Sequence, residues 1–124
     1  MKTRPIMKPL FIVLICCLAG VSAARAHAFL DHADPRVGST VKASPGEVII
    51  WFTEGLILPF SDLKVLDASG KEMPVSNKHL DPSNGSLLIV FVAPLKPGKY
   101  TVSWRATAVD THVTHGTFPF EVSP

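Results

Sequence analysis

The sequence predicts an all-β fold, an immunoglobulin-like Greek-key β-sandwich of about seven strands. Short apolar or alternating runs are separated by Pro, Gly, Asn and Asp, and no segment keeps the periodicity of an amphipathic helix. About seven such runs in roughly 100 residues match the strand density of an immunoglobulin-like sandwich. No cysteine follows residue 26, so the predicted sandwich has no disulfide of the antibody type.

The expected strands differ in how clearly the residues mark them. Residues 47–53 (EVIIWFT) are rich in β-branched and aromatic side chains and give the clearest central strand. Residues 86–92 (SLLIVFV) give a second core strand, and 99–109 give a long strand whose alternate residues, from Tyr100 to Ala108, share one face. Shorter strands are expected at 28–32, 62–67, 72–75 and 116–122, with the polar residues 76–85 as a loop. Trp51 and Trp104 are expected to fill the core.

Residues 1–26, called the leader below, have the composition of a cleaved secretory signal peptide. Three Lys or Arg residues precede an unbroken apolar run at 10–18, and small residues lead to Ala24-Arg25-Ala26. The run is shorter than the ~20 residues of a membrane-spanning helix. Cleavage after Ala26 leaves a single domain, residues 27–124, with a periplasmic location. The same small-x-small rule also fits cuts after Ala24 and Ala28, and the second cut would remove His27.

The formal net charge of the domain without the leader differs from the +2 of the full chain. The leader holds four of the 12 Lys and Arg residues and none of the acids, which leaves eight basic and ten acidic residues and a formal charge of −2. No basic patch remains to indicate a nucleic-acid partner. Both cysteines lie in the leader, so the domain has no thiolate ligand and no cysteine nucleophile. Nitrogen and oxygen are therefore the main ligand types available.

His27 would begin the domain after cleavage at Ala26. Its α-amine and imidazole can then chelate one metal ion through two nitrogens. Copper(II) heads the divalent affinity order and accepts tetragonal sets of nitrogen and oxygen ligands. Because the α-amine has a pKa near 8, binding at neutral pH must displace a proton. The alternative is an N-terminal histidine that is frayed and solvated.

Asp110 and His112 are the second group of chemically capable residues. Two residues apart on a strand, they would share one face, so the carboxylate can bind the same ion or orient the imidazole. The alternative is a plain Asp–His hydrogen bond at a solvated strand end. His115, at a spacing that suits a turn, and Glu54, at the end of the 47–53 strand, are candidate neighbours of the metal. No Ser-His-Asp order, phosphate loop or paired catalytic carboxylates is present, so we expect no enzyme.

Several short motifs carry a resemblance that covers residues 27–124. They are His27-Ala28, Asp34-Pro35 with Gly38-Ser39, Phe52-Thr53-Glu54-Gly55, Leu95 to Val102, and Trp104 to Gly116 through Asp110-Thr111-His112. Their order and spacing resemble the CopC family of periplasmic copper-binding proteins.

The resemblance implies a seven-stranded Greek-key sandwich with one copper(II) ion. The implied ligands are the amine and imidazole of His27 and the imidazole of His112, with Asp110 close by as a further ligand. The implied role is a copper carrier or sequestering protein in copper homeostasis or resistance, partnered by a membrane copper transporter of the CopD type. We expect a monomer.

The chain departs from some members of that family in its methionine content. Those members have a copper(I) site in a methionine-rich loop, whereas Met73 is the only methionine after residue 26 here. Copper(I) favours several soft ligands, so we expect copper(II) binding alone. Two other functions remain as alternatives, a copper-dependent oxidative enzyme with a histidine brace and a metal-free sandwich that serves as an interaction module.

Overall fold

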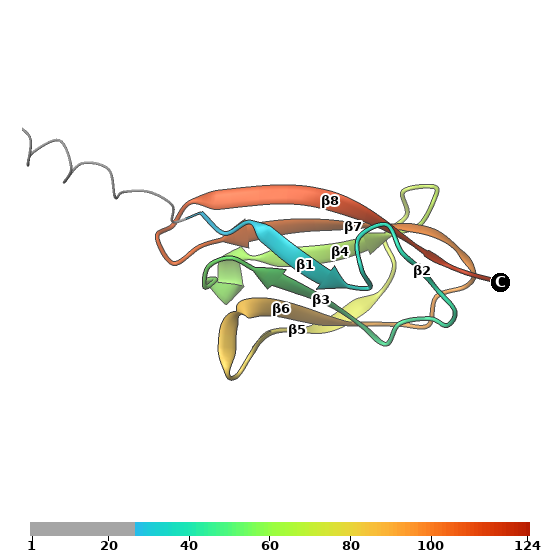
Figure 1. Cartoon of the computed structure of the whole chain (residues 1–124), viewed down its shortest axis with the longest axis horizontal. Coiled ribbons are helices and arrows are strands. Elements are labelled where there is room, and N and C mark those ends of the chain that lie inside the picture. The colour runs from blue at the N-terminus through green and yellow to red at the C-terminus, as the bar shows by residue number, and fades with distance from the viewer. Residues whose placement is uncertain (1–26) are drawn as a thin grey trace, which may run out of the picture.

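A computed structural model describes residues 27–124, and the predicted signal peptide lies outside these described residues. The described chain forms two packed β-sheets (Figure 1). Its elements are β1 (Leu30–Asp34), β2 (Thr40–Val41), β3 (Glu47–Phe52), the 3₁₀ turn η1 (Leu58–Phe60), β4 (Asp62–Leu66), β5 (Val75–Asp81), β6 (Asn84–Val92), β7 (Gly98–Thr107) and β8 (Val113–Val122). No helix among residues 27–124 is long and apolar enough to cross a membrane.

The strand order confirms the predicted sandwich class. One sheet has the order β1-β3-β6-β5 and the other β2-β8-β7-β4, and all pairs are antiparallel except β2 with β8. Only the hairpins β5–β6 and β7–β8 join neighbours in the sequence, and every other connection crosses between the sheets, as in immunoglobulin-like sandwiches. The described residues contain eight strands, one more than the sequence predicted.

Alternation along the strands explains the core. Val48, Ile50 and Phe52 of β3 are buried while the residues between them are not. On β7 the predicted shared face is confirmed, because every second residue from Tyr100 to Ala108 is at most 8% exposed. Successive side chains of a strand point to opposite faces, so these two runs meet between the sheets and exclude water.

The prediction of a loop at residues 76–85 was wrong. Residues Val75–Asp81 form β5, which pairs with β6 at the edge of its sheet. One side of an edge strand faces solvent, so polar residues are tolerated there and the sequence pattern resembles a loop. Irregular register between Ser76 and His79, with Asn77 at a φ of 54°, further weakens the strand signal. The strand expected at 72–75 is reduced to one bridge between Leu66 and Glu72.

Of the two tryptophans expected in the core, only Trp104 lies there, and the prediction for Trp51 was wrong. Trp51 lies between the buried Ile50 and Phe52, so alternation turns it to the outer face, where its ring stacks on His32 at a centroid distance of 4.3 Å. Trp104 packs against Gly116, and a Cβ atom at residue 116 would lie 2.7 Å from its Cζ2. The absence of a side chain at Gly116 therefore lets β8 lie close over this ring.

Three segments that are distant in sequence meet at one end of the sandwich (Figure 1). They are the segment that enters β1, the end of β3 and the connection between β7 and β8. The C-terminus lies at the opposite end. This arrangement brings the beginning of the domain next to residues 108–112, where the sequence placed its candidate ligands.

Candidate metal site

The connection between β7 and β8 is a tight turn that contains Asp110 and His112. The backbone N–H of Thr111 donates to the carbonyl of Ala108 at 2.8 Å, and that of Ala108 donates to the carbonyl of His112 at 3.0 Å. The carboxylate of Asp110 accepts from the backbone N–H of His112 at 3.1 Å. The expectation that these residues share a strand was wrong, because their proximity comes from an Asx turn, a local fold that aspartate favours.

The side chains of Asp110 and His112 are also paired directly. His112 Nδ1 lies 2.8 Å from Asp110 Oδ2. Because an ionised carboxylate can only accept, His112 donates its Nδ1 hydrogen and keeps the lone pair of Nε2 for another partner. The side chain of His112 is 64% exposed and that of Asp110 is 26% exposed. The pair thus presents one oriented imidazole to solvent.

The electrostatics of Asp110 favour its charged form. Partial desolvation raises the pKa of this carboxyl, but hydrogen bonds from the side chain and backbone of His112, together with the charges of His112 and His27, outweigh it. The net result is a pKa below the ordinary value of 3.8. At neutral pH the site therefore includes a carboxylate that can balance a cation.

His27 joins this pair from the other end of the domain sequence. One potential ligand atom from each of His27, Asp110 and His112 lies within 4.8 Å of the others. The rings of His27 and His112 have a centroid distance of 4.5 Å and an interplanar angle of 43°. His27 and His112 are exposed. Two imidazoles and one carboxylate thus converge, as the sequence proposed, although 83 residues or more separate His27 from the others.

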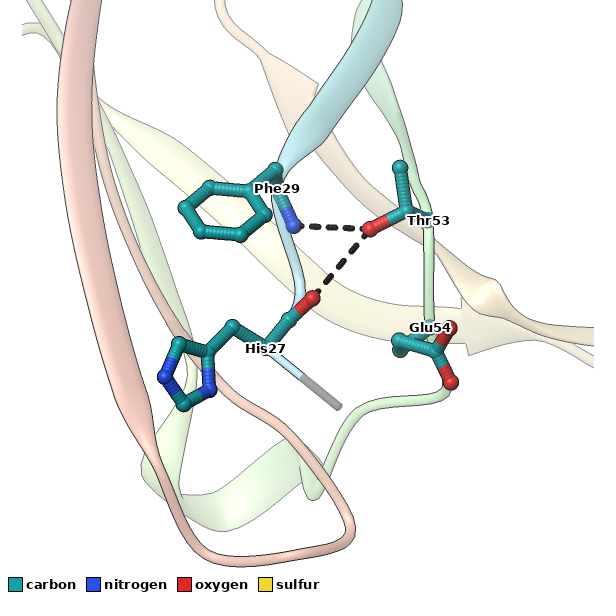
Figure 2. A pocket seen from close by; sticks show the side chains of 4 residues that line it. All are labelled: His27, Phe29, Thr53 and Glu54. Carbon is teal, nitrogen blue, oxygen red and sulfur yellow. Dashed lines mark hydrogen bonds between the residues drawn. The ribbon is translucent and has the colours of Figure 1, made fainter. Parts of the chain in front are cut away.

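The segment before β1 is fixed against the end of β3 (Figure 2). The hydroxyl of Thr53 accepts from the backbone N–H of Phe29 at 2.9 Å and donates to the carbonyl of His27 at 3.3 Å. The sequence placed Thr53 in a family motif but indicated no role for it, because a threonine at the end of a strand is ordinary. Its role depends on the pairing of β1 with β3, which no local pattern reveals.

Glu54 lies beside His27 but outside the group of three. A cavity of about 380 Å³ is lined by His27, Phe29, Thr53 and Glu54. In Figure 2 the carboxylate of Glu54 and the imidazole of His27 lie on opposite sides of the His27 backbone. The structure therefore places Glu54 near the backbone of His27, on the side away from its ring.

His115 lies on β8 rather than in a turn, and the structure does not bring it to the group. It pairs with Arg105 of β7 and lines a separate cavity of about 440 Å³ on the outer face of the sheet. Asp62, Lys64 and Ser103 share that cavity. Alternation along β8 explains this position, because the inward-facing residue at this end is Thr114.

The donor set suits a borderline transition metal. Imidazole nitrogen and carboxylate oxygen together favour copper(II), nickel(II) or zinc(II), whereas a hard ion such as calcium prefers oxygen alone. The exposed imidazoles leave room for further ligands. The three side chains thus form a candidate nitrogen-rich metal site at the surface.

Comparison with known proteins identifies the family. The family model described as the CopC domain matches residues 30–123. The chain belongs to the CopC family. Proteins of this family bind copper without catalysing a reaction and are typically periplasmic. The expectation that the chain is not an enzyme is thereby confirmed, and the oxidative alternative is set aside.

Individual CopC relatives agree with this assignment. Protein YobA of Escherichia coli K12 is 34% identical over 100 residues, which cover 78% of this chain and 79% of that protein. Copper resistance protein C of Pseudomonas syringae pv. tomato is 33% identical over 119 residues, which cover 90% of this chain and 94% of that protein.

Solved CopC structures confirm the fold. CopC from Methylosinus trichosporium OB3b superposes with a TM-score of 0.75 at 30% identity, covering 79% of this chain and 95% of that one. PcoC from Escherichia coli, described as a methionine-rich copper resistance protein, gives 0.72 at 28% identity and covers 79% of this chain and 100% of that one.

Proposed function

We propose that residues 27–124 carry one copper(II) ion, held by the α-amine and imidazole of His27 and the imidazole of His112, with Asp110 as a further ligand. The observation that supports this best is the convergence of the three side chains within 4.8 Å in a CopC-family fold. The copper resistance named in the relatives is the physiological role we propose for this chain.

Asp110 has two tasks in this proposal. Its hydrogen bonds to His112 hold the imidazole with Nε2 free, and a carboxylate that accepts the other ring hydrogen strengthens a histidine ligand. Its negative charge also offsets that of the ion, to which it supplies an oxygen. Glu54, across the cavity in Figure 2, acts as a neighbour of the His27 backbone rather than a partner of its ring.

The proposal requires that the leader is removed after Ala26. In an uncut chain the nitrogen of His27 belongs to a peptide bond and cannot serve as an amine ligand. The periplasm typical of the family is also the compartment that a cleaved signal peptide would reach.

Copper(II) rather than copper(I) is the proposed cargo. Met73 packs partly buried against the core, and no other methionine follows residue 26. A single thioether in that position offers copper(I) none of the several soft ligands it favours. The chain would act as a monomeric carrier or sequestering protein and, as a carrier, would deliver copper to a membrane transporter of the CopD type.

The experiment that tests the site compares two preparations, one beginning at His27 and one with a glycine placed before it. We expect tight copper(II) binding by the first and a loss of at least ~100-fold in affinity for the second, because the added residue converts the amine into an amide. Equal, tight binding would place the site elsewhere. Weak binding by both would contradict the proposed function and leave the metal-free module.

A further inference from the structure

The first residues of a domain are usually poorly ordered unless something ties them down. Here the segment that precedes β1 is closely held. Ala28 is fully buried, although it lies only one residue from the proposed start of the mature chain. Its neighbours His27 and Phe29 are exposed. Since His27 carries two of the proposed ligand atoms, the contacts that order this segment decide where these atoms lie.

Two threonine hydroxyls, one from each sheet, hold the segment. Thr53, which follows β3, bonds both the N–H of Phe29 and the carbonyl of His27. Thr114, the second residue of β8, donates its hydroxyl to the carbonyl of Ala28. Figure 2 shows the first of these contacts, with the Thr53 hydroxyl between the two backbone groups. The backbone from His27 to Phe29 is thus pinned from both sides.

Thr114 also connects the segment to the turn that holds the other ligands. It is two residues after His112, and the β-ladder of β7 and β8 begins beside it, at the pair Thr107 and Val113. The hydroxyl of Thr114 therefore fixes the backbone beside His27 relative to the same strand that carries His112. Ring contact between His27 and His112 is consistent with this fixed relation.

We propose that Thr53 and Thr114 are positioning residues of the copper site, which hold His27 in its binding geometry before the ion arrives. The inference rests on the proposed function of His27 as a ligand. Ordering a free chain end costs conformational entropy, and a site that is already ordered does not incur this cost on binding. Copper affinity therefore depends on two hydroxyls that need not touch the ion.

The test uses the domain beginning at His27 with the substitutions Thr53→Val and Thr114→Val. Valine keeps the β-branched shape of threonine and removes the hydroxyl. We expect each variant to bind copper(II) ~10- to 100-fold more weakly, the range found when an outer partner of a ligand is lost. Thr53→Ser and Thr114→Ser keep a hydroxyl and should restore affinity. Thr101→Val and Thr117→Val, on the sheet that contains Thr114 but away from the segment, should change the affinity less than about twofold.

A second measurement separates positioning from general stability. In the metal-free protein, NMR relaxation and amide exchange should show greater mobility of residues 27–29 in both valine variants, with an unchanged core. The EPR spectrum of their copper complexes should also shift, since His27 binds in an altered geometry. Serine variants should match the wild type in both measurements.

The outcomes are distinct. Wild-type affinity in Thr53→Val and Thr114→Val would overturn the inference, as would weaker binding with residues 27–29 as ordered as before. If the wild-type domain itself fails to bind copper(II), the proposed function falls, whereas the mobility of the metal-free variants still reports whether the hydroxyls hold the segment.

Discussion

Three turns within residues 27–124 share one local design, and only one of them lies at the candidate site. In each, an aspartate accepts a hydrogen bond from the backbone N–H two residues later, in Asp67–Ser69, Asp81–Ser83 and Asp110–His112. In the first two, a serine hydroxyl donates to the same carboxylate oxygen. In the third, the imidazole of His112 instead donates a hydrogen bond to the other carboxylate oxygen of Asp110.

The turn at the candidate site differs little from the two serine turns. All three carboxyls have a pKa below 3.8, each with hydrogen bonds from the residue two positions later as a cause. In the serine turns the hydroxyl donates its hydrogen to the aspartate within the turn. The histidine turn leaves Nε2 free, and it lies where His27 arrives from the first residues of the domain. The capacity of this turn to bind a metal ion therefore depends on the imidazole of His112 and on the position of the turn beside His27.

The largest loss of copper(II) affinity should come from replacing His112 with the serine found at the same place in the other two turns. His112→Ser keeps the Asx turn but removes a proposed ligand, so copper(II) affinity should fall more than ~100-fold, beyond the cost of losing an outer partner. Isothermal titration with a competing chelator would measure it. Ser69→Ala is the matched control and should leave affinity unchanged. If His112→Ser binds copper(II) as tightly as the wild type, His112 is not a ligand.

A smaller loss is expected from Asp110→Asn. Asparagine can keep the turn, because its carbonyl accepts the same backbone hydrogen bond, but it carries no charge. Copper(II) affinity should fall by ~10- to 100-fold, as for other carboxylates that support a histidine ligand. Asp81→Asn, the same change in a serine turn, should bind copper normally. A loss in both variants would point to a general effect of net charge.

The backbone of the histidine turn offers a gain in stability. Thr111 has a φ of 75°, a left-handed conformation that costs a β-branched residue about 1–2 kcal/mol. Glycine adopts it freely, so Thr111→Gly should stabilise the domain by up to about 1 kcal/mol, allowing for the entropy of glycine, and raise Tm by roughly 4 °C. Thermal unfolding of the metal-free protein would test this. A lower Tm would show that Thr111 makes a contact worth more than the strain.

The smallest effect concerns the pH dependence of the serine turns. The hydroxyl of Ser69, followed by the backbone N–H of Lys71, lowers the pKa of Asp67 below 3.8. A lowered pKa in the folded state means that ionised Asp67 stabilises the domain above about pH 3.8, and this stabilisation disappears as pH falls through the lower folded value. Asp67→Asn should therefore lower Tm slightly at pH 7, and the difference from wild type should vanish in acid strong enough to protonate Asp67 in the folded state. A difference that persists in acid would assign the effect to something other than charge.

Burial imposes alternation on a strand, and on β7 this pattern revealed both the strand and its inner face, from Tyr100 to Ala108. On β3 the residue types revealed the strand but not its inner face, because Trp51 was expected in the core and lies on the outer face. β5 was missed because an edge strand with polar side chains obeys no such constraint. The convergence of His27, Asp110 and His112 was predicted. However, Asp110 and His112 were expected to share the face of a strand, whereas they lie in an Asx turn. The hydroxyl contacts of Thr53 and Thr114 depend on which distant strands pair, and this pairing could not be predicted from the local sequence.

Residues 27–124 begin and end at opposite ends of the sandwich (Figure 1), which determines how this domain can be attached to another molecule or surface. The C-terminal tail is anchored far from the candidate metal site, with β2 parallel to β8 and the N–H of Ser123 bonded to the carbonyl of Val41 (Figure 1). A linker, dye or solid support joined after Pro124 therefore leaves the proposed copper ligands facing outward. The same addition ahead of His27 would consume the amine. Fusions and immobilised forms should accordingly be built from the tail.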